Sequence, residues 1–221
     1  MNRQSRIDLV CFDVGGVLIR VCTSFQEGTF TAGLPVRLPS GEMTRLFDCA
    51  RDARHALRTG KLRMDEFARR VSSTFNGVYT PAEISSIMAT WVRETYPETE
   101  ALLLALKQSN GLKVAVLSNT CREHWAQICA CPWMKHIDYI FTSHELGIAK
   151  PSSEIYSAVE SSTGVAPARI LFMDDARENI DASQQRGWNS VLIDCTQERN
   201  AQILRALSAW NIDWNAGVRA F

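Results

Sequence analysis

Polar side chains recur along the chain at the ends of apolar runs, in an order that could support nucleophilic chemistry assisted by a metal ion. Asp13 directly follows residues 9–12, a short run of strand formers, and precedes the pair Gly15-Gly16. A carboxylate at the end of a buried parallel strand, facing a glycine loop, is well placed as a nucleophile or a metal ligand. The later polar groups are Ser118-Asn119 after residues 114–117, Lys150 before Pro151, and Asp174-Asp175 after residues 170–173. Together they predict one catalytic set.

The apolar periodicity predicts the elements that position this set. Residues 7–17 are expected to form a strand and a loop. Residues 25–96 have a helical pattern with no convincing strand, including helices over 41–57 (ended by Gly60), over 64–75 and from Thr80-Pro81, where Glu83 completes a capping box. Strands then alternate with helices: strands over 113–117, 139–142, 170–173 and 190–193, and helices over 98–108, 123–129, after Pro151, 178–186 and 201–209. Residues 211–221 are expected to form a tail.

This alternation predicts an α/β protein with an open parallel sheet flanked by helices, and an all-helical insertion after the first strand. The predicted domains are an α/β core of residues 1–20 and 97–221, and a helical domain of residues 21–96.

Composition excludes several classes of partner. The chain has 221 residues, 24 of them basic and 24 acidic, so its zero net charge gives no electrostatic reason to expect binding to nucleic acid or to an anionic membrane. We find no signal peptide and no segment long enough to span a membrane. Seven scattered cysteines predict free thiols in a reducing compartment, and we therefore expect a cytoplasmic protein.

The order Asp13-x-Gly15, Ser118, Lys150-Pro151 and Asp174-Asp175 resembles the four motifs of the haloacid dehalogenase (HAD) superfamily, most of whose members are phosphohydrolases. The resemblance extends from the first strand to about residue 194, and the insertion corresponds to that superfamily's α-helical cap. Residues 117–120, 145–151 and 174–179 are most similar to the branch that contains bacterial α-D-glucose-1-phosphate phosphatase. The resemblance implies a HAD-type Rossmann-like fold.

By the same resemblance, Asp13 attacks phosphorus to form an aspartyl-phosphate, which water then hydrolyses. The implied cofactor is Mg²⁺, which prefers oxygen ligands. Its protein ligands are expected to be Asp13, the carbonyl of Gly15, and Asp175, while Asp174 and Asn179 support them from behind.

The phosphate is expected to bind to Ser118, Asn119 and Lys150. A hydroxyl and nearby N–H groups at a strand end can hold phosphate oxygens, and Lys150 adds a fixed positive charge for the phosphate and the nucleophile.

Gly15 departs from the commonest pattern, in which a second Asp acts as general acid and base. Such catalysis is typically worth about 10²–10⁴-fold. The glucose-1-phosphate phosphatase branch also has glycine here. An anomeric hydroxyl is comparatively acidic and leaves readily without a proton, so Gly15 favours substrates with good leaving groups.

The function predicted from the sequence is Mg²⁺-dependent hydrolysis of a small phosphomonoester, with a sugar phosphate favoured; the oligomeric state is left open. Two alternatives remain. A dehalogenase would use Asp13 on carbon, but the adjacent Asp174-Asp175 would repel its anionic substrate unless a cation lies between. A non-catalytic binding or regulatory protein would retain the fold and bind ligand without releasing phosphate.

Two sets of residues are expected to lie outside the chemistry. The basic residues between 51 and 63 are interpreted as a solvated face of the insertion rather than as specificity contacts. The four histidines, which share no common spacing, are interpreted as structural or surface residues.

Overall fold

The core of the protein is a five-stranded parallel sheet in the order β5-β4-β1-β6-β7. The structure, a computed structural model, describes residues 6–109 and 111–214. The strands are β1 (Leu9–Phe12), β4 (Lys113–Ser118), β5 (Tyr139–Thr142), β6 (Ile170–Asp174) and β7 (Asn189–Leu192). Each of the four neighbouring pairs is parallel, so the carboxyl ends of all five strands meet at one edge of the sheet.

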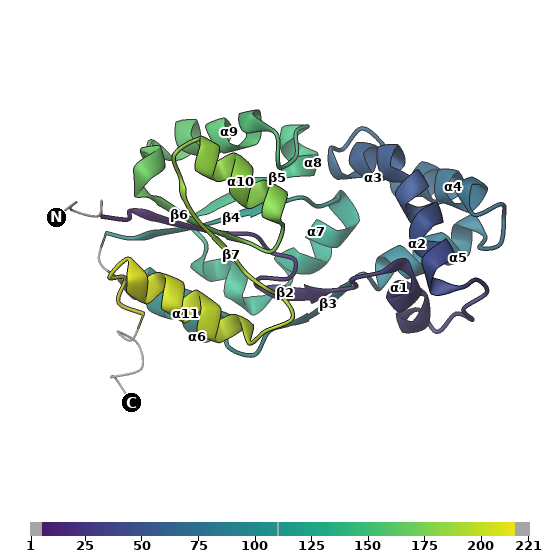
Figure 1. The fold of residues 1–221 in the computed structure, drawn as a ribbon, viewed down its shortest axis with the longest axis horizontal. Coiled ribbons are helices and arrows are strands. Elements are labelled where there is room, and N and C mark those ends of the chain that lie inside the picture. The colour runs from purple at the N-terminus through teal and green to yellow at the C-terminus, as the bar shows by residue number, and fades with distance from the viewer. Residues whose placement is uncertain (1–5, 110, 215–221) are drawn as a thin grey trace.

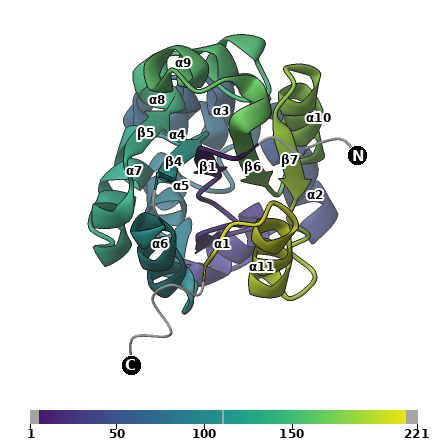
Figure 2. The same ribbon diagram turned by 90° about the vertical axis from the view of Figure 1, so that its left-hand side faces the viewer.

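Helices cover both faces of this sheet, as the view along the molecule shows (Figure 2). On one face lie α6 (Thr99–Gln108), α7 (Arg122–Cys129) and α11 (Arg199–Ala209), and on the other lie α9 (Ser153–Thr163) and α10 (Arg177–Gln185). Val10 and Phe12 of β1 join the apolar core of the first face, while Leu9 and Cys11 join that of the second. Burial on both faces explains why β1 is a continuous apolar run. Short helices α8 (Ser143–Leu146), η1 (Pro132–His136) and η2 (Pro167–Arg169) complete the core.

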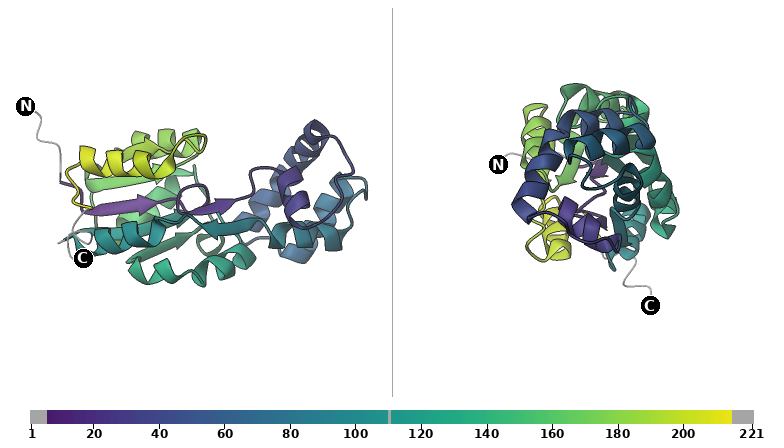
Figure 3. Two further views of the ribbon diagram at one scale, coloured as in Figure 1. Left: turned by 90° about the horizontal axis from the view of Figure 1, so that it is seen from below. Right: turned by 90° about the vertical axis from the view of Figure 1, so that its right-hand side faces the viewer.

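The insertion forms a separate helical lobe beside the carboxyl edge of the sheet (Figures 1 and 3). It contains α1 (Phe25–Thr31), α2 (Ser40–Cys49), α3 (Arg51–Arg58), α4 (Met64–Thr74) and α5 (Pro81–Ala89). We call this lobe the cap. It has its own hydrophobic core, in which Phe25 packs against Phe47, Phe75 and Tyr79. The capping box predicted at Thr80 and Glu83 is present at the start of α5.

A two-stranded antiparallel ribbon joins cap and core. β2 (Ile19–Val21) leaves the core and β3 (Val92–Thr95) returns to it, with Ile19 opposite Thr95 and Val21 opposite Val92. The prediction that residues 25–96 contain no strand was therefore wrong. β3 has four residues, and its two central side chains are exposed, so it lacks the apolar alternation by which a strand is identified.

Two helix predictions also differ from the structure. Residues 41–57 form two helices that meet at Ala50, because the chain bends there while both helices bury apolar residues in the same cap core. The helix after Pro151 begins at Ser153 rather than at the proline. The predicted α/β fold with a helical insertion is confirmed, while the exact domain limits stay predictions. Of the predicted tail, residues 215–221 lie outside the described residues.

Candidate active site

A cavity of about 240 Å³ lies between the carboxyl ends of the strands and the cap. The core contributes Asp13, Gly15, Ser118, Asn119, Thr120, Lys150, Asp175, Glu178 and Asn179, and the cap contributes Phe47, Arg54, Leu57, Arg58, Phe67 and Met88. All the residues predicted for the site except Asp174 line this cavity, and Asp174 lies directly behind it against Lys150. The structure therefore brings the whole predicted set together.

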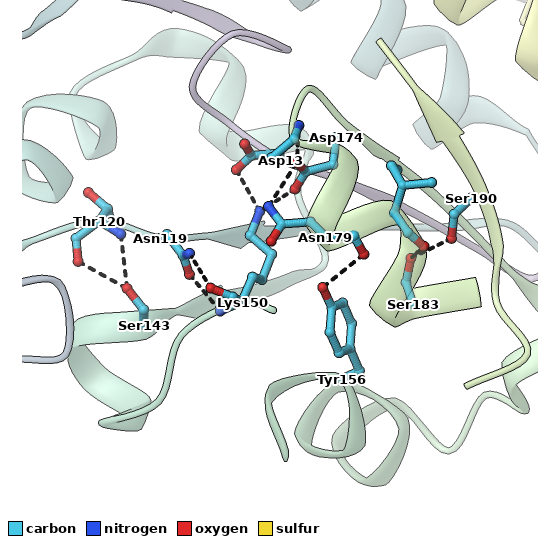
Figure 4. Close-up of polar contacts among 12 residues, drawn as sticks. Asp13, Asn119, Thr120, Ser143, Lys150, Tyr156, Asp174, Asn179, Ser183 and Ser190 are labelled. Atoms are coloured by element: carbon cyan, nitrogen blue, oxygen red, sulfur yellow. Dashed lines mark hydrogen bonds and ion pairs between the residues drawn. The ribbon is translucent and has the colours of Figure 1, made fainter. Parts of the chain in front are cut away.

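Lys150 is the centre of the polar network (Figure 4). Its Nζ lies 2.9 Å from Asp13 Oδ1 and 2.6 Å from Asp174 Oδ2, and only 1% of its side chain is exposed. Asp13 directly follows β1. The Asp13 N–H donates to the carbonyl oxygen of Met173 in β6, which extends the pairing of these two strands by one residue. A buried cation between two carboxylates fixes all three groups, since burial without partners would be costly.

Both carboxylate oxygens of Asp174 accept hydrogen bonds from neighbouring residues. Its Oδ2 accepts from Lys150, and its Oδ1 accepts from the Ala176 N–H at 2.8 Å and from Asn179 Nδ2 at 2.9 Å. Asp174 is fully buried. It is therefore placed to orient Lys150 and the start of α10, in agreement with a supporting role.

Asp175 points the other way, toward the loop after β1. The left-handed backbone of Gly16 (φ +76°) brings it so close that a Cβ there would lie 2.3 Å from Asp175 Oδ2. Cys195 Sγ donates to the same oxygen at 3.5 Å. Oxygen atoms of Asp13, Asp174 and Asp175 all lie within 4.8 Å of one another. With Asp174 engaged, Asp13 and Asp175 are the two carboxylates available to a cation.

The donor set fits a hard divalent cation, because such ions take oxygen ligands. Asn179 supplies a second observation: its Oδ1 is buried and accepts from none of the described residues, although its Nδ2 is bonded to Asp174. An acceptor left over beside a carboxylate cluster is in keeping with a site that takes up a cation and its water.

The electrostatics of the network follow from three carboxylates sharing one lysine. Burial raises the pKa of Asp13 from 3.8 to about 7, although Lys150 opposes the shift, and Asp174 and Asp175 add to it. Burial and the neighbouring Asp174 also raise the pKa of Asp175. Burial alone would lower the pKa of Lys150, but Asp13 and Asp174 together raise it. Lys150 thus stays charged. Its single positive charge does not neutralise all three carboxylates, so a further cation bound between them would be favoured.

The loop after β4 is fixed by side-chain bonds to its own neighbours. The Asn119 side chain donates to the Lys150 carbonyl oxygen at 2.8 Å and accepts from the Lys150 N–H at 2.9 Å. Asn119 therefore holds the Lys150 backbone, in addition to lining the cavity. Ser118 is the last residue of β4 and is buried at the cavity wall.

Gly15 lines the cavity beside the ribbon to the cap. A Cβ on Gly15 would lie 3.3 Å from Val21 Cγ1, tighter than an ordinary contact. A larger residue at position 15 would thus require Val21 of β2 to shift. The space around position 15 therefore fits glycine better than the second Asp of the commonest pattern.

Two kinds of residue at the cavity were not predicted. Arg54 and Arg58 of α3 line it, although Arg58 is also exposed and Arg54 is half-buried, so these two residues of the basic stretch reach the cavity as well as solvent. His124 of α7 also lines it, and its Nε2 donates to the Met88 carbonyl oxygen at 2.8 Å. The four-residue spacing of the two arginines, which puts both on one helix face, was the available signal.

The remaining predictions concern thiols and membranes. All seven cysteines are free thiols, as predicted. Within residues 6–109 and 111–214, no helix has the length and apolar content to cross a bilayer.

Comparison with known proteins gives a family match across most of the chain. The family model for haloacid dehalogenase-like hydrolases matches residues 7–187. D-ribitol-5-phosphate phosphatase of Bacteroides thetaiotaomicron is 25% identical over 192 residues, which cover 82% of this chain and 89% of that protein. A phosphatase of Mycobacterium tuberculosis is 28% identical over 116 residues, 52% of this chain and 53% of its own.

Solved structures share the fold. A HAD family enzyme of Bacteroides thetaiotaomicron, solved in complex with magnesium and inorganic phosphate, superposes with a TM-score of 0.70 at 23% identity, over 87% of this chain and 96% of that chain. The L-2-haloacid dehalogenase of Xanthobacter autotrophicus gives a TM-score of 0.60 at 18% identity, over 95% of this chain and 87% of its own. At these identities the likeness concerns the fold.

Proposed function

The chain belongs to the haloacid dehalogenase-like hydrolase family, and we propose that it is a Mg²⁺-dependent phosphatase that hydrolyses a small sugar phosphate through an aspartyl-phosphate on Asp13. The observation that carries this proposal is the arrangement of Asp13, Lys150 and Asp175 around one cavity, with Asp174 behind them. Phosphoryl transfer needs a nucleophile in line with the leaving oxygen and positive charge beside the equatorial oxygens.

Asp13 is the proposed nucleophile. Its Oδ1 is paired with Lys150, while its Oδ2 forms no hydrogen bond or ion pair with the described residues. Attack by the carboxylate on phosphorus forms a P–O bond to Asp13 and breaks the bond to the sugar oxygen, which takes a proton from water; a second water then attacks phosphorus, which releases phosphate and regenerates the Asp13 carboxylate. Lys150, Ser118 and the loop around Asn119 are proposed to hold the phosphate oxygens.

Asp13, the Gly15 carbonyl and Asp175 are proposed to hold the cation, with Asp174 and Asn179 orienting them. When bound, Mg²⁺ supplies charge that screens the repulsion between the carboxylate and the phosphate. The raised pKa values of Asp13 and Asp175 support this proposal, because positive charge between two carboxylates favours their ionised forms.

A sugar phosphate is the favoured substrate class. D-ribitol-5-phosphate phosphatase, one of the relatives, acts on a phosphorylated sugar alcohol, which supports this class more than glucose 1-phosphate in particular. The small cavity favours a small molecule.

The test is phosphate release by the purified protein from a panel of phosphomonoesters. The panel contains hexose 1-phosphates, hexose 6-phosphates, pentitol 5-phosphates and an aryl phosphate, each with Mg²⁺ or a chelator. We expect Mg²⁺-dependent release that falls by at least about 10³-fold in Asp13→Asn. Halide release from a 2-haloacid without phosphatase activity would identify a dehalogenase. Mg²⁺ binding without release from any substrate would identify a non-catalytic protein.

A further inference from the structure

We propose that the cap wall of the cavity binds a second anionic group of the substrate, through Arg58 with Arg54 beside it, so that the substrate is a phosphorylated sugar acid or a sugar bisphosphate. This inference rests on the proposed function. It names the end of the substrate that lies away from Asp13, the group proposed to attack phosphorus.

Arg58 is a cation without a carboxylate partner. It lines the cavity from the last turn of α3, and none of the ion pairs or side-chain hydrogen bonds among residues 6–109 and 111–214 involves its guanidinium group. Most other arginines at the molecule's surface pair with a carboxylate, as Arg70 does with Glu66. Arg58 is exposed but lines the cavity, and a guanidinium whose N–H donors have no partner among the described residues is suited to a planar or tetrahedral anion.

Arg54 places a second guanidinium one helical turn away. It packs over the Phe47 ring, with its Cζ 4.6 Å from the centroid, and its Nη2 lies 3.1 Å from Asp48 Oδ1. Its Nε, however, is buried and donates to none of the described residues. A buried N–H without an acceptor costs about 1–3 kcal/mol. An acceptor brought by a ligand would remove that cost.

The charges around Arg58 on α3 favour the binding of an anion. Desolvation lowers the pKa of Arg58, even though part of the residue is exposed, and the charge of Arg54 lowers it further. Two like charges one turn apart repel each other. Asp13 across the cavity acts in the opposite direction, so both ends of the cavity lie within electrostatic reach of each other. Glu178 also lines the cavity but forms no ion pair with Arg58 within 4.0 Å.

The backbone of Arg58 is anchored to the catalytic core. Ser143 Oγ donates to the Arg58 carbonyl oxygen at 2.6 Å and accepts from the Thr120 N–H at 2.9 Å. Gly60 fits against the same point, since a Cβ there would lie 2.4 Å from the His144 carbonyl oxygen. These contacts fix the backbone position of Arg58 relative to the loop after β4, which contains Asn119 and Thr120. A substrate of defined length can therefore meet both ends at once.

The experiment compares pairs of substrates that differ in the second anionic group. One pair is 6-phosphogluconate and sorbitol 6-phosphate, which differ in a terminal carboxylate, and the other is fructose 1,6-bisphosphate and fructose 6-phosphate. Steady-state kinetics are measured for the wild-type protein, Arg58→Gln, Arg58→Lys and the control Arg51→Gln. Arg51 lies on the same helix and is exposed like Arg58, but it does not line the cavity.

We expect the wild-type protein to prefer, in at least one pair, the member that carries the second anionic group. In Arg58→Gln, the KM for that member should rise roughly 10- to 100-fold, as for a lost hydrogen bond to a charged group. Its kcat should change little, because the contact lies away from the reacting phosphorus. Arg58→Lys should recover part of the loss, and Arg51→Gln should match the wild type. The pair that responds identifies the second group as a carboxylate or a phosphate.

Equal losses for both members of each pair, or a wild-type preference for the members that lack the second anionic group, would overturn the inference. Failure of the proposed function is distinguished by calorimetry on Asp13→Asn with and without Arg58→Gln, titrated with 6-phosphogluconate and sorbitol 6-phosphate. If no substrate is hydrolysed but 6-phosphogluconate binds more tightly through Arg58, the anion site stands without the activity. If Arg58→Gln leaves both affinities unchanged, the anion site is refuted.

Discussion

The two walls of the cavity differ in how their charges are paired. On the core wall, Lys150 contacts the carboxylates of Asp13 and Asp174. Asp174 also accepts hydrogen bonds from Ala176 and Asn179. On the cap wall, Arg58 has no partner among the described residues, and Arg54 keeps a buried N–H unused. The cation of the core wall, Lys150, is paired before any substrate arrives, whereas Arg58 of the cap wall gains an anionic partner only from a ligand.

This difference separates chemistry from selection. Groups that stabilise a transition state act best when they are fixed in advance. Groups that select the substrate can carry charges without a partner in the protein. A substrate that lacks the complementary charge leaves them unpaired and is disfavoured for that reason. The contrast predicts opposite responses to mutation on the two walls.

The largest effect is expected from removing the core cation. Lys150→Met leaves Asp13 and Asp174 buried without a partner, and should lower the free energy of unfolding by about 3–5 kcal/mol. Chemical denaturation in the absence of Mg²⁺ measures it. The matched change on the cap wall, Arg58→Met, removes a cation without a partner and should stay within about 0.5 kcal/mol of the wild type. Similar losses for both variants would contradict the contrast between the walls.

The next effect is the pH dependence of Mg²⁺ binding. The pKa of Asp13 is raised to about 7, so the folded protein without metal holds a proton there at lower pH. The stability that this proton gives the metal-free fold is fully present below about pH 4 and is lost progressively as the pH rises from about 4 through 7. Since Mg²⁺ must displace the proton, its apparent affinity should fall about tenfold for each pH unit below 7.

Calorimetric titration with Mg²⁺ at several pH values between 5 and 8 checks this dependence. Asp13→Asn carries no such proton and should show weaker binding with a shallower pH profile. An affinity that is constant across this range in the wild-type protein would show that Asp13 is already ionised without metal.

The smallest effect concerns the contact that joins the walls. Ser143→Ala removes the bonds to the Arg58 carbonyl oxygen and to the Thr120 N–H, and should cost about 1–2 kcal/mol of unfolding free energy. Ser86→Ala is the control, because the Ser86 hydroxyl bonds only to Ala82 one turn back on the exposed face of α5. If the two variants lose the same stability, the contact between cap and core contributes nothing of its own.

The two walls also differ in how far they could be predicted from sequence. Asp13, Ser118 and Asp174 were found because each ends a strand whose apolar run is visible locally, and parallel strands end at one edge of a sheet. Lys150 was found through its motif with Pro151. The central role of Lys150, bonded to two carboxylates, required the folded structure.

The cap wall depends on contacts between distant residues. Which face of α3 meets the cavity is decided by the Ser143–Arg58 contact, which spans 85 residues of sequence, and periodicity within a helix carries no such information. His124 was missed for the same reason, because its bond to Met88 joins α7 to the cap. The ribbon of β2 and β3 was missed because its strands have only three and four residues, and the two central side chains of β3 are exposed, so no apolar alternation marks it.

The most direct test of the central claim is chemical trapping of the covalent intermediate. The protein is mixed with its best phosphomonoester and Mg²⁺, quenched in acid during turnover, and treated with borohydride, which reduces an acyl phosphate to the alcohol. Peptide mass spectrometry should then find homoserine in place of Asp13, only when substrate and Mg²⁺ are both present. Phosphate release with Asp13 unmodified in the trapped protein, or with another carboxylate reduced instead, would contradict the proposed mechanism.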